Sequence, residues 1–265
     1  MGDVRPAAVA GLFYPDDPTI LAHMVKCLLA EAAAKVATDA SPPKAIIAPH
    51  AGYVYSGSIA ASAYVRLSPL KGVVRRVILL GPAHRVPVLG LAAPSVSAFA
   101  TPIGPLELDR DAIERLLSFP QVSIADEPHR LEHSIEVHLP FLIAVLGGVR
   151  IVPLVVGEAR SEAVDEVIEA LWDGPETLIV VSSDLSHYLD YETARKTDRA
   201  TSTAIEALDA DAIGWDQACG RIPIAGLLQT ARRRGLKARM VDLRNSGDTA
   251  GPRREVVGYG AYLFD

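Results

Sequence analysis

The sequence predicts one α/β domain over residues 1–265, in which helices flank a mostly parallel sheet. Three continuous apolar runs carry this prediction, because strands that are buried on both faces have this pattern. Segments with apolar residues at helical spacing alternate with the runs, an order typical of parallel sheets. The length suits one large or two small domains, and neither a composition shift nor an internal repeat divides the chain. The three runs are Ala45–Ala48, Arg76–Leu80 and Leu178–Val181.

The elements of the first half follow from helix caps, helix breakers and apolar spacing. Asp17 or Thr19 can cap the first helix, and Asp109 can cap a later one. Pro140 lies inside a helical pattern over Leu131–Leu146, so we expect a kink or a break there. The other predictions are helices from Asp17 or Thr19 to about Lys35, over Ile59–Leu67 and over Arg110–Leu117, a linker over Ala37–Pro43, and strands over Gly90–Ala93 and Val122–Ala125.

The second half continues the alternation of helices and strands. Pro153 interrupts an apolar run over Arg150–Val156, which predicts a strand at a sheet edge or with a bulge. A Gly-rich loop over Asn245–Pro252 lacks the lysine and the spacing of a phosphate-binding loop. The remaining predictions are helices over Glu162–Trp172, Thr193–Leu208, Asp211–Ala218 and Pro223–Arg234, and strands over Lys237–Leu243 and Val256–Phe264.

The composition is that of a globular protein and argues against several kinds of partner. A net charge of −6 and a pI of about 5.7 argue against nucleic acid. The sequence has no apolar run of membrane-spanning length and no signal-peptide pattern at Met1, so we expect no membrane partner and a cytoplasmic location. Two cysteines, Cys27 and Cys219, do not make a disulfide framework and indicate a reducing compartment.

Polar side chains that can bind a metal follow each of the three apolar runs. His50 follows the first run, His84 the second, and Asp184 with His187 the third. Ligands bind beyond the carboxyl ends of the strands in open α/β sheets, so we expect these side chains to meet in one place. Neutral imidazole suits iron, copper and zinc. The alternatives are structural histidines held by hydrogen bonds and, for Asp184, a helix cap with His187 in the first turn.

The segment from Glu132 to His138 is dense in titratable groups. It is not the His-Glu-x-x-His pattern of a zinc protease helix. We expect one or two of its side chains to face the cleft, with His138 and Glu136 ahead of His129. The alternative is an exposed polar face of a helix, on which Glu132 and Glu136 lie together.

The two cysteines differ in their surroundings. Cys219 stands at a predicted junction between two helices, beside Gly220 and Pro223, where a thiolate can be a metal ligand or a nucleophile. Cys27 lies inside an apolar helical pattern and is expected to be a buried small side chain, which is the common state of a lone cysteine.

Taken together, these motifs resemble those of the MEMO family, whose prokaryotic members are also called AmmeMemoRadiSam system protein B. The match runs in order through almost the whole chain. The matching motifs are Ala10–Pro15, Ala48–Tyr53, Gly81–His84, Glu132–Phe141, Ser182–His187, Cys219–Arg221 and Val257–Tyr262.

The resemblance implies a fold, a site and partners. The MEMO family is similar in architecture to the LigB-like class III extradiol dioxygenases, which hold a non-haem iron(II) with two histidines and one carboxylate. It implies His50, His84 and Cys219 as metal ligands, with a thiolate in place of the carboxylate. It also implies His138, Asp184 and His187 as catalytic side chains beside the metal. Iron(II) is the implied cofactor, with copper or zinc as alternatives. The implied partners are a small molecule and the radical-SAM and AMMECR1-like proteins of the same system.

Four functions are consistent with the sequence. The first is a redox enzyme of the iron(II) oxygenase type, in which His138 or His187 acts as acid or base. The second is a zinc hydrolase with Asp184 or Glu136 as base. The third is a binding module without activity that captures a metal or a peptide. The fourth uses Cys219 as a thiol nucleophile.

Overall fold

Four parallel strands form the centre of the sheet in the computed structural model, which describes residues 3–35 and 41–265. Their order is β2 (Ala45–Ala48), β9 (Thr177–Ser182), β3 (Arg76–Pro82) and β8 (Arg150–Val156). Except for the arginines at the starts of β3 and β8, their residues are buried, as the apolar runs predict. The predicted linker reaches from residue 37 to residue 43, and its residues 37–40 lie outside the described part of the chain.

Antiparallel strands flank this parallel centre, so the complete sheet of nine strands is mixed. On one side β12 (Val256–Phe264) pairs with β2. It also pairs with β10 (His187–Leu189) and β11 (Ala238–Asn245). On the other side β4 (Leu91–Ala93) runs antiparallel to β8 and parallel to β7 (Val122–Ile124). A second, small sheet joins β1 (Val4–Arg5), β5 (Ala98–Phe99) and β6 (Leu106–Glu107).

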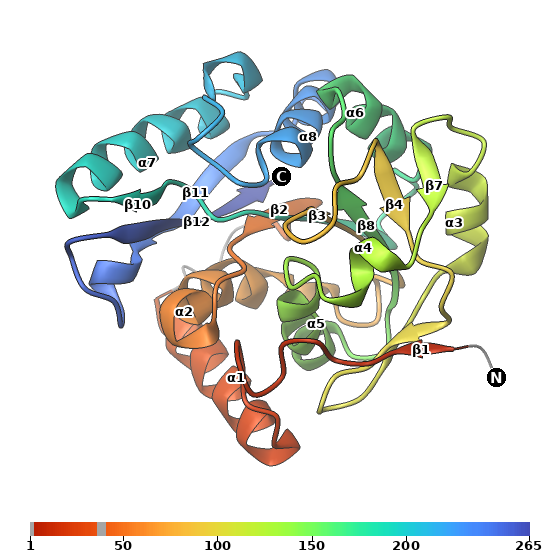
Figure 1. The fold of residues 1–265 in the computed structure, drawn as a ribbon, viewed down its shortest axis with the longest axis horizontal. Coiled ribbons are helices and arrows are strands. Elements are labelled where there is room, and N and C mark those ends of the chain that lie inside the picture. The colour runs from red at the N-terminus through yellow and green to blue at the C-terminus, as the bar shows by residue number, and fades with distance from the viewer. Residues whose placement is uncertain (1–2, 36–40) are drawn as a thin grey trace.

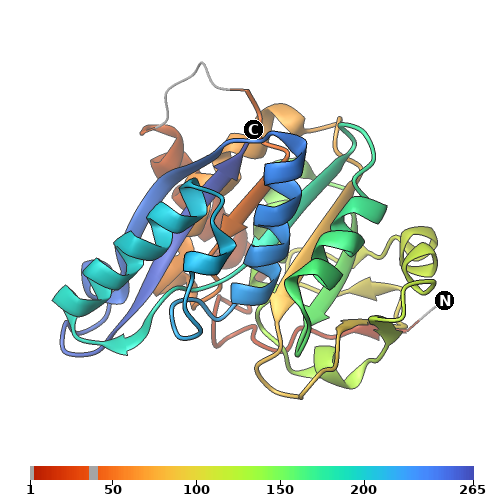
Figure 2. The ribbon, with the colours of Figure 1, turned by 90° about the horizontal axis from the view of Figure 1, so that it is seen from above.

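Helices cover both faces of the large sheet and complete an α/β domain of three layers (Figures 1 and 2). One face carries α1 (Pro18–Ala33), α2 (Tyr53–Tyr64) and α5 (Leu139–Leu146), and the other carries α6 (Ser161–Ala170), α7 (Tyr191–Glu206) and α8 (Arg221–Arg234). In the described part of the chain, every helix is too short or too polar to cross a membrane. The remaining elements are α3 (Arg110–Leu116), α4 (Glu127–Arg130) and the 3₁₀ turns η1 (Val65–Leu70), η2 (Glu136–His138), η3 (Ala210–Ala212) and η4 (Ser246–Asp248).

Some boundaries differ from the predicted ones for identifiable reasons. Helix α2 begins at Tyr53, six residues before the predicted start, directly after Gly52. The helix predicted over Leu131–Leu146 is wrong for its first half. Helix α5 begins at Leu139 and has Pro140 in its first turn, where a missing N–H costs nothing. The helix predicted over Asp211–Ala218 is also wrong, since only the short turn η3 forms there.

Pro153 lies in an interior strand, not at an edge. Strand β8 pairs along its whole length with β3, and Pro153 lies opposite Leu79. The pairing between β8 and β4 is confined to Val155 and Val156. Strand β8 therefore accepts a proline because β4 does not pair with it at that position.

Candidate metal centre

The carboxyl ends of three neighbouring strands bring His50, Asp184 and His84 together. Strand β9 lies between β2 and β3, with Ser182 opposite Ala48 and Val181 opposite Leu80. Each of these three residues stands two positions beyond the last residue of its strand. The expectation that these strand ends meet at one edge of the sheet is confirmed by this register.

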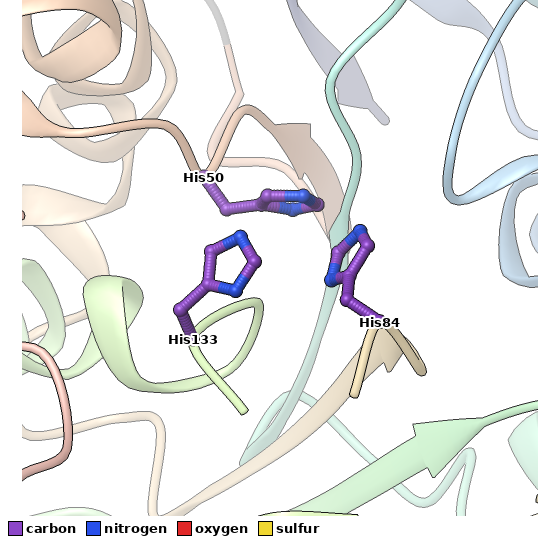
Figure 3. Close-up of side chains that lie close together, drawn as sticks. All are labelled: His50, His84 and His133. Atoms are coloured by element: carbon purple, nitrogen blue, oxygen red, sulfur yellow. The ribbon is translucent and has the colours of Figure 1, made fainter. Parts of the chain in front are cut away.

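Three imidazoles converge at this edge. One ring nitrogen each of His50, His84 and His133 lies within 4.8 Å of the others, a spacing that can hold one metal ion (Figure 3). The ring centroid of His50 lies 5.1 Å from that of His84 and 5.3 Å from that of His133. His50 is 2% exposed, whereas His84 and His133 are more accessible.

Hydrogen bonds fix the tautomer of His50. The Ser182 hydroxyl donates its one proton to the Ser134 carbonyl at 2.5 Å, so it accepts from the nearby imidazoles. His50 Nδ1–H therefore donates to Ser182 Oγ at 2.6 Å, which leaves His50 Nε2 unprotonated, with a lone pair that can bind a metal. Burial, followed by the charges of the neighbouring His84, His133 and His138, lowers the pKa of His50 well below its usual value. The ring is thus neutral and has the form that a metal ligand requires.

Glu132 orients the ring of His84 through a hydrogen bond at Nδ1, as Ser182 does for His50. Its Oε1 accepts from His84 Nδ1 at 2.9 Å, and its Oε2 accepts from the His84 backbone N–H at 2.7 Å. Burial raises the pKa of Glu132, but the adjacent His133 and His84 imidazoles and a hydrogen bond from the Ser134 backbone outweigh it and hold that pKa well below the usual range. A carboxylate behind a metal-ligating histidine sets its ring orientation and increases its basicity. His84 Nε2 is therefore available to a metal.

His133 is a member of the cluster that the sequence did not single out. The chain from 131 to 135 is a turn, so His133 and Glu132 face the site independently of helical spacing. His133 Nδ1 lies 3.1 Å from Glu132 Oε1 without the alignment of a hydrogen bond and is buried without a hydrogen-bond partner. The density of titratable groups in Glu132–His138 marked the segment, but the assumed helix pointed to the wrong members.

Cys219, in the turn before α8, lies beside His50 but outside the group of three imidazole nitrogens. Its Sγ lies 3.4 Å from His50 Nε2, and it accepts from the Asp184 backbone N–H at 3.3 Å. A side chain at Gly220 would collide with the end of β9, since an added Cβ would lie 2.5 Å from the Ser182 carbonyl oxygen. Burial and the Asp184 carboxylate raise the pKa of Cys219 to about 12, so the metal-free thiol is protonated at neutral pH. This protonation argues against Cys219 as a thiol nucleophile in the metal-free protein.

Asp184 and His187 line an open pocket of about 430 Å³ beside His133. Asp184 Oδ1 accepts from the His50 backbone N–H at 2.8 Å. Burial raises the pKa of Asp184, against the lowering effect of that hydrogen bond. His187 begins strand β10, so the alternative in which Asp184 caps a helix with His187 in its first turn is wrong. Both side chains are placed where they can exchange protons with a bound molecule.

His138 lies behind the cluster, not in the pocket. It is buried, and its Nε2–H donates to Ser182 Oγ at 2.8 Å while its Nδ1 accepts from the Tyr64 hydroxyl at 2.9 Å. Burial lowers the pKa of His138 to about 3. The ring is neutral, and both of its nitrogens have protein partners. His138 therefore positions Ser182 and, through Ser182, His50.

Three further side chains that stood out in the sequence lie outside the cluster. Glu136 is fully buried and accepts from Arg5, Tyr14 and two backbone N–H groups, so it is not free to act as the base of a hydrolase. His129 is buried and donates to the Ala92 carbonyl at 2.9 Å. Cys27, expected to be buried, is exposed on α1.

The residues at this edge fit a single metal ion. Two tetrahedral ligands, one nitrogen and one sulfur, lie about 3.5 Å apart at usual zinc–ligand distances, and the separation between His50 Nε2 and Cys219 Sγ is 3.4 Å. The donors of His50 and His84 are held in the correct tautomer, and the third nitrogen of the group comes from His133. These residues define an α/β protein with a histidine-rich candidate metal centre at the carboxyl edge of its sheet.

The chain belongs to the Memo family. The family described as "Memo-like protein" matches residues 5–263. The chain is 36% identical to a "MEMO1 family protein" of Aquifex aeolicus over 98% of this chain and 99% of that protein. It is also 36% identical to a "MEMO1 family protein" of Aeropyrum pernix over 97% of this chain and 98% of that protein.

The fold is similar to that of a solved structure. It is the crystal structure of an uncharacterized protein from Escherichia coli K12, with a TM-score of 0.53. The match covers 83% of this chain and 98% of that chain, at 11% sequence identity. This likeness supports the α/β architecture described above.

Proposed function

We propose that this protein is a mononuclear metal enzyme of the redox, oxygenase type that acts on a small organic molecule. The observation that carries the proposal is the convergence of three imidazole donors at the wall of an open pocket. His50 and His84 would hold the metal, together with His133, Cys219 or both. Imidazole suits iron, copper and zinc alike, so the choice of iron(II) rests on the resemblance to the non-haem iron dioxygenases.

The chain itself would supply binding and proton transfer. A bound iron(II) would supply one-electron chemistry and open coordination positions. Asp184 and His187 line the pocket and would hold or move a proton at the substrate. Glu132 and Ser182 would keep the imidazoles in the binding tautomer.

A zinc hydrolase is a second candidate, since three histidines are also the ligand set of some catalytic zinc sites. In that case Asp184 would be the base, because Glu136 is fully engaged in structural hydrogen bonds. The native metal distinguishes the two candidates.

Metal analysis of protein purified without oxygen tests the site and the metal together. We expect about one iron per chain in the wild type, and strongly reduced metal in His50→Ala and His84→Ala. His23→Ala and Cys27→Ser are matched controls, because both side chains are exposed on α1, and we expect them to keep the metal. Zinc in the wild type would favour the hydrolase, and retention of metal in both site variants would exclude this site.

Cobalt substitution identifies the remaining ligand. A thiolate ligand gives cobalt(II) a sulfur-to-metal charge-transfer band, which imidazole does not give. If Cys219 binds, the band is present in the wild type and in His133→Ala and is lost in Cys219→Ser. A wild-type spectrum without this band, together with weaker metal binding in His133→Ala, would assign the third position to His133.

A further inference from the structure

The pocket beside the metal centre has an uneven distribution of charge. Asp184 and Glu255 contribute carboxylates to its wall, and none of the described residues that line it is a lysine or an arginine. The cation nearest to Glu255 is Arg254 at 4.0 Å, and both of these side chains are largely exposed to solvent. Such an exposed pair is weak and strongly screened. A negatively charged ligand would therefore lose its water beside Asp184, with the imidazoles of His133 and His187 but no lysine or arginine in the wall to replace that water.

The uncharged part of the wall is rich in aromatic rings. Tyr259 is 2% exposed, and burial followed by the nearby Asp184 carboxylate raises its pKa, with smaller contributions from Tyr55 and Tyr188. All of these side chains line the same pocket. The face of an aromatic ring attracts a cation, and several rings around one point are the usual way of binding an organic ammonium group. The aromatic side chains of the wall are Phe13, Tyr55, Tyr188 and Tyr259.

The backbone at Tyr188 is held in a costly conformation. Its φ is +58°, in the left-handed region that residues other than glycine rarely adopt. The pairing of β10 with β12 shifts register between His187 and Leu189, so Tyr188 lies at an irregularity of the strand. Its side chain is 75% exposed at the pocket wall. Strain of this kind concentrates at ligand-binding sites.

We infer that the pocket binds a small organic cation, an amine with an apolar or aromatic body, and rejects carboxylates and phosphates of the same size. The ammonium group would lie between the carboxylates of Asp184 and Glu255 and the faces of the tyrosine rings. This inference rests on the proposed function, because it names the class of substrate for that site.

A bound metal does not reverse this preference. A divalent ion adds two positive charges beside the imidazoles. Three carboxyl groups oppose that charge: Glu132 lies behind His84, and Asp184 and Glu255 lie in the pocket wall. A thiolate at Cys219 would make the charge more negative.

Three probes with the same ring test the charge preference: 2-phenylethylamine, 2-phenylethanol and phenylacetate. Calorimetric titration of the full-length protein, as purified without oxygen and again after chelation, gives their affinities. We expect the amine to bind about tenfold more tightly than the alcohol and the carboxylate in both forms. Equal affinity of the three, tighter binding of phenylacetate to the metal-free form, or binding by none of them would overturn the inference.

Variants of the wall separate the two contributions. Glu255→Gln is expected to weaken the amine about three- to tenfold and leave the alcohol unchanged. Tyr55→Leu keeps the apolar contact and is expected to weaken only the amine. Glu114→Gln, an exposed change on α3, is the matched control and is expected to change neither affinity. Amine binding unaffected by both wall variants would contradict the proposed position of the ammonium group.

The same samples distinguish this inference from the proposed function. Metal content is measured beside each titration. A protein that keeps its metal but shows no preference for the amine would overturn the substrate class alone. A wild type without metal would overturn the proposed function, and the charge preference of the pocket would still be tested by the chelated form.

Discussion

Ser182 links two histidines of different roles through one hydroxyl. It donates to the Ser134 carbonyl and accepts from His50 Nδ1 and His138 Nε2. Tyr64 completes the chain by donating to His138 Nδ1. Every proton in this chain therefore has one allowed position, and the chain ends at the lone pair of His50 Nε2. A hydroxyl behind the ring takes the part that a carboxylate takes behind His84.

Replacement of Ser182 by alanine tests this arrangement. We expect Ser182→Ala to weaken metal binding about 10- to 100-fold, the usual effect of removing a partner behind a metal-ligating histidine. The affinity is measured by competition with a chelator. Nitrogen NMR of the metal-free protein should show a single Nδ1–H tautomer for His50 in the wild type and a mixture in the variant.

Two controls accompany Ser182→Ala. Ser182→Thr keeps the hydroxyl and should retain most of the affinity. Ser68→Ala removes an exposed hydroxyl that donates to the Val65 carbonyl and should change nothing. If Ser182→Ala binds metal as tightly as the wild type, the tautomer of His50 does not depend on this hydroxyl.

At the scale of elements, the N-terminal segment and the segment that carries His133 form one unit. Buried Glu136 accepts from Arg5 Nη1 at 2.6 Å and from the Tyr14 hydroxyl at 2.5 Å. Arg5 also donates to the carbonyls of His129 and Glu132. The ring of Phe13, in the same N-terminal segment, lies 4.7 Å from the ring of His133. The position of His133 therefore depends on residues at the start of the chain.

Glu136→Gln tests this connection. It leaves the Arg5 guanidinium buried without its charged partner, which typically costs about 3–5 kcal/mol of unfolding free energy. We expect a loss of this size in urea unfolding of the metal-free protein, and weaker metal binding in the fraction that stays folded.

The exposed pair of Arg130 and Glu127 provides the comparison. Arg130→Ala should leave the free energy of unfolding nearly unchanged, as is usual for an ion pair in solvent. A similar, small cost for both variants would show that the Arg5–Glu136 pair does not hold the two segments together.

The sequence predicted the strand ends of the site better than its other members. His50, His84 and Asp184 follow continuous apolar runs, and such runs have few alternatives to a buried parallel strand. His133 was missed because the segment has helical spacing but begins as a turn. The ion pair that fixes this turn joins residues 131 positions apart along the chain, and local patterns do not contain that information. Cys219 was identified through the resemblance, since a turn before a helix has no distinguishing spacing.

On the scale of the whole molecule, the antiparallel strands were the part of the topology that sequence patterns did not specify. Strand β12 is as apolar and buried as the parallel strands, yet it runs antiparallel to β2. A strand that is buried on both faces has the same apolar sequence pattern whether it runs parallel or antiparallel to its neighbour. The connection sets only one of these directions: β11 and β12 are joined by a short loop around η4, which requires an antiparallel pair, whereas no local pattern sets the pairing of β12 with β2.

The fold buries imidazoles, and this makes its stability sensitive to acid. Burial lowers the pKa of His129 to about 4 and that of His138 to about 3, from an unfolded value near 6.5. The unfolded chain therefore binds more protons below pH 6.5, and the stabilisation by these neutral rings is lost as the pH falls toward the folded pKa values. Burial raises the pKa of Asp198 from 3.8 to about 6. The stabilisation that this carboxyl group contributes is therefore present at low pH and is lost as the pH rises through 6, opposite to the effect of the two histidines.

His129→Gln isolates one of these contributions, because glutamine can still donate to the Ala92 carbonyl but does not titrate. Urea unfolding of the metal-free protein at pH 6.5 and 4.5 gives the loss of stability for each chain. We expect the variant to lose about 2 kcal/mol less than the wild type over this interval, since each pH unit below the unfolded pKa costs about 1.4 kcal/mol for one group. His23→Gln, an exposed change on α1, should follow the wild type. If His129→Gln loses stability as steeply as the wild type, then His129 accepts a proton in the folded state, and its burial beside Ala92 does not keep it neutral.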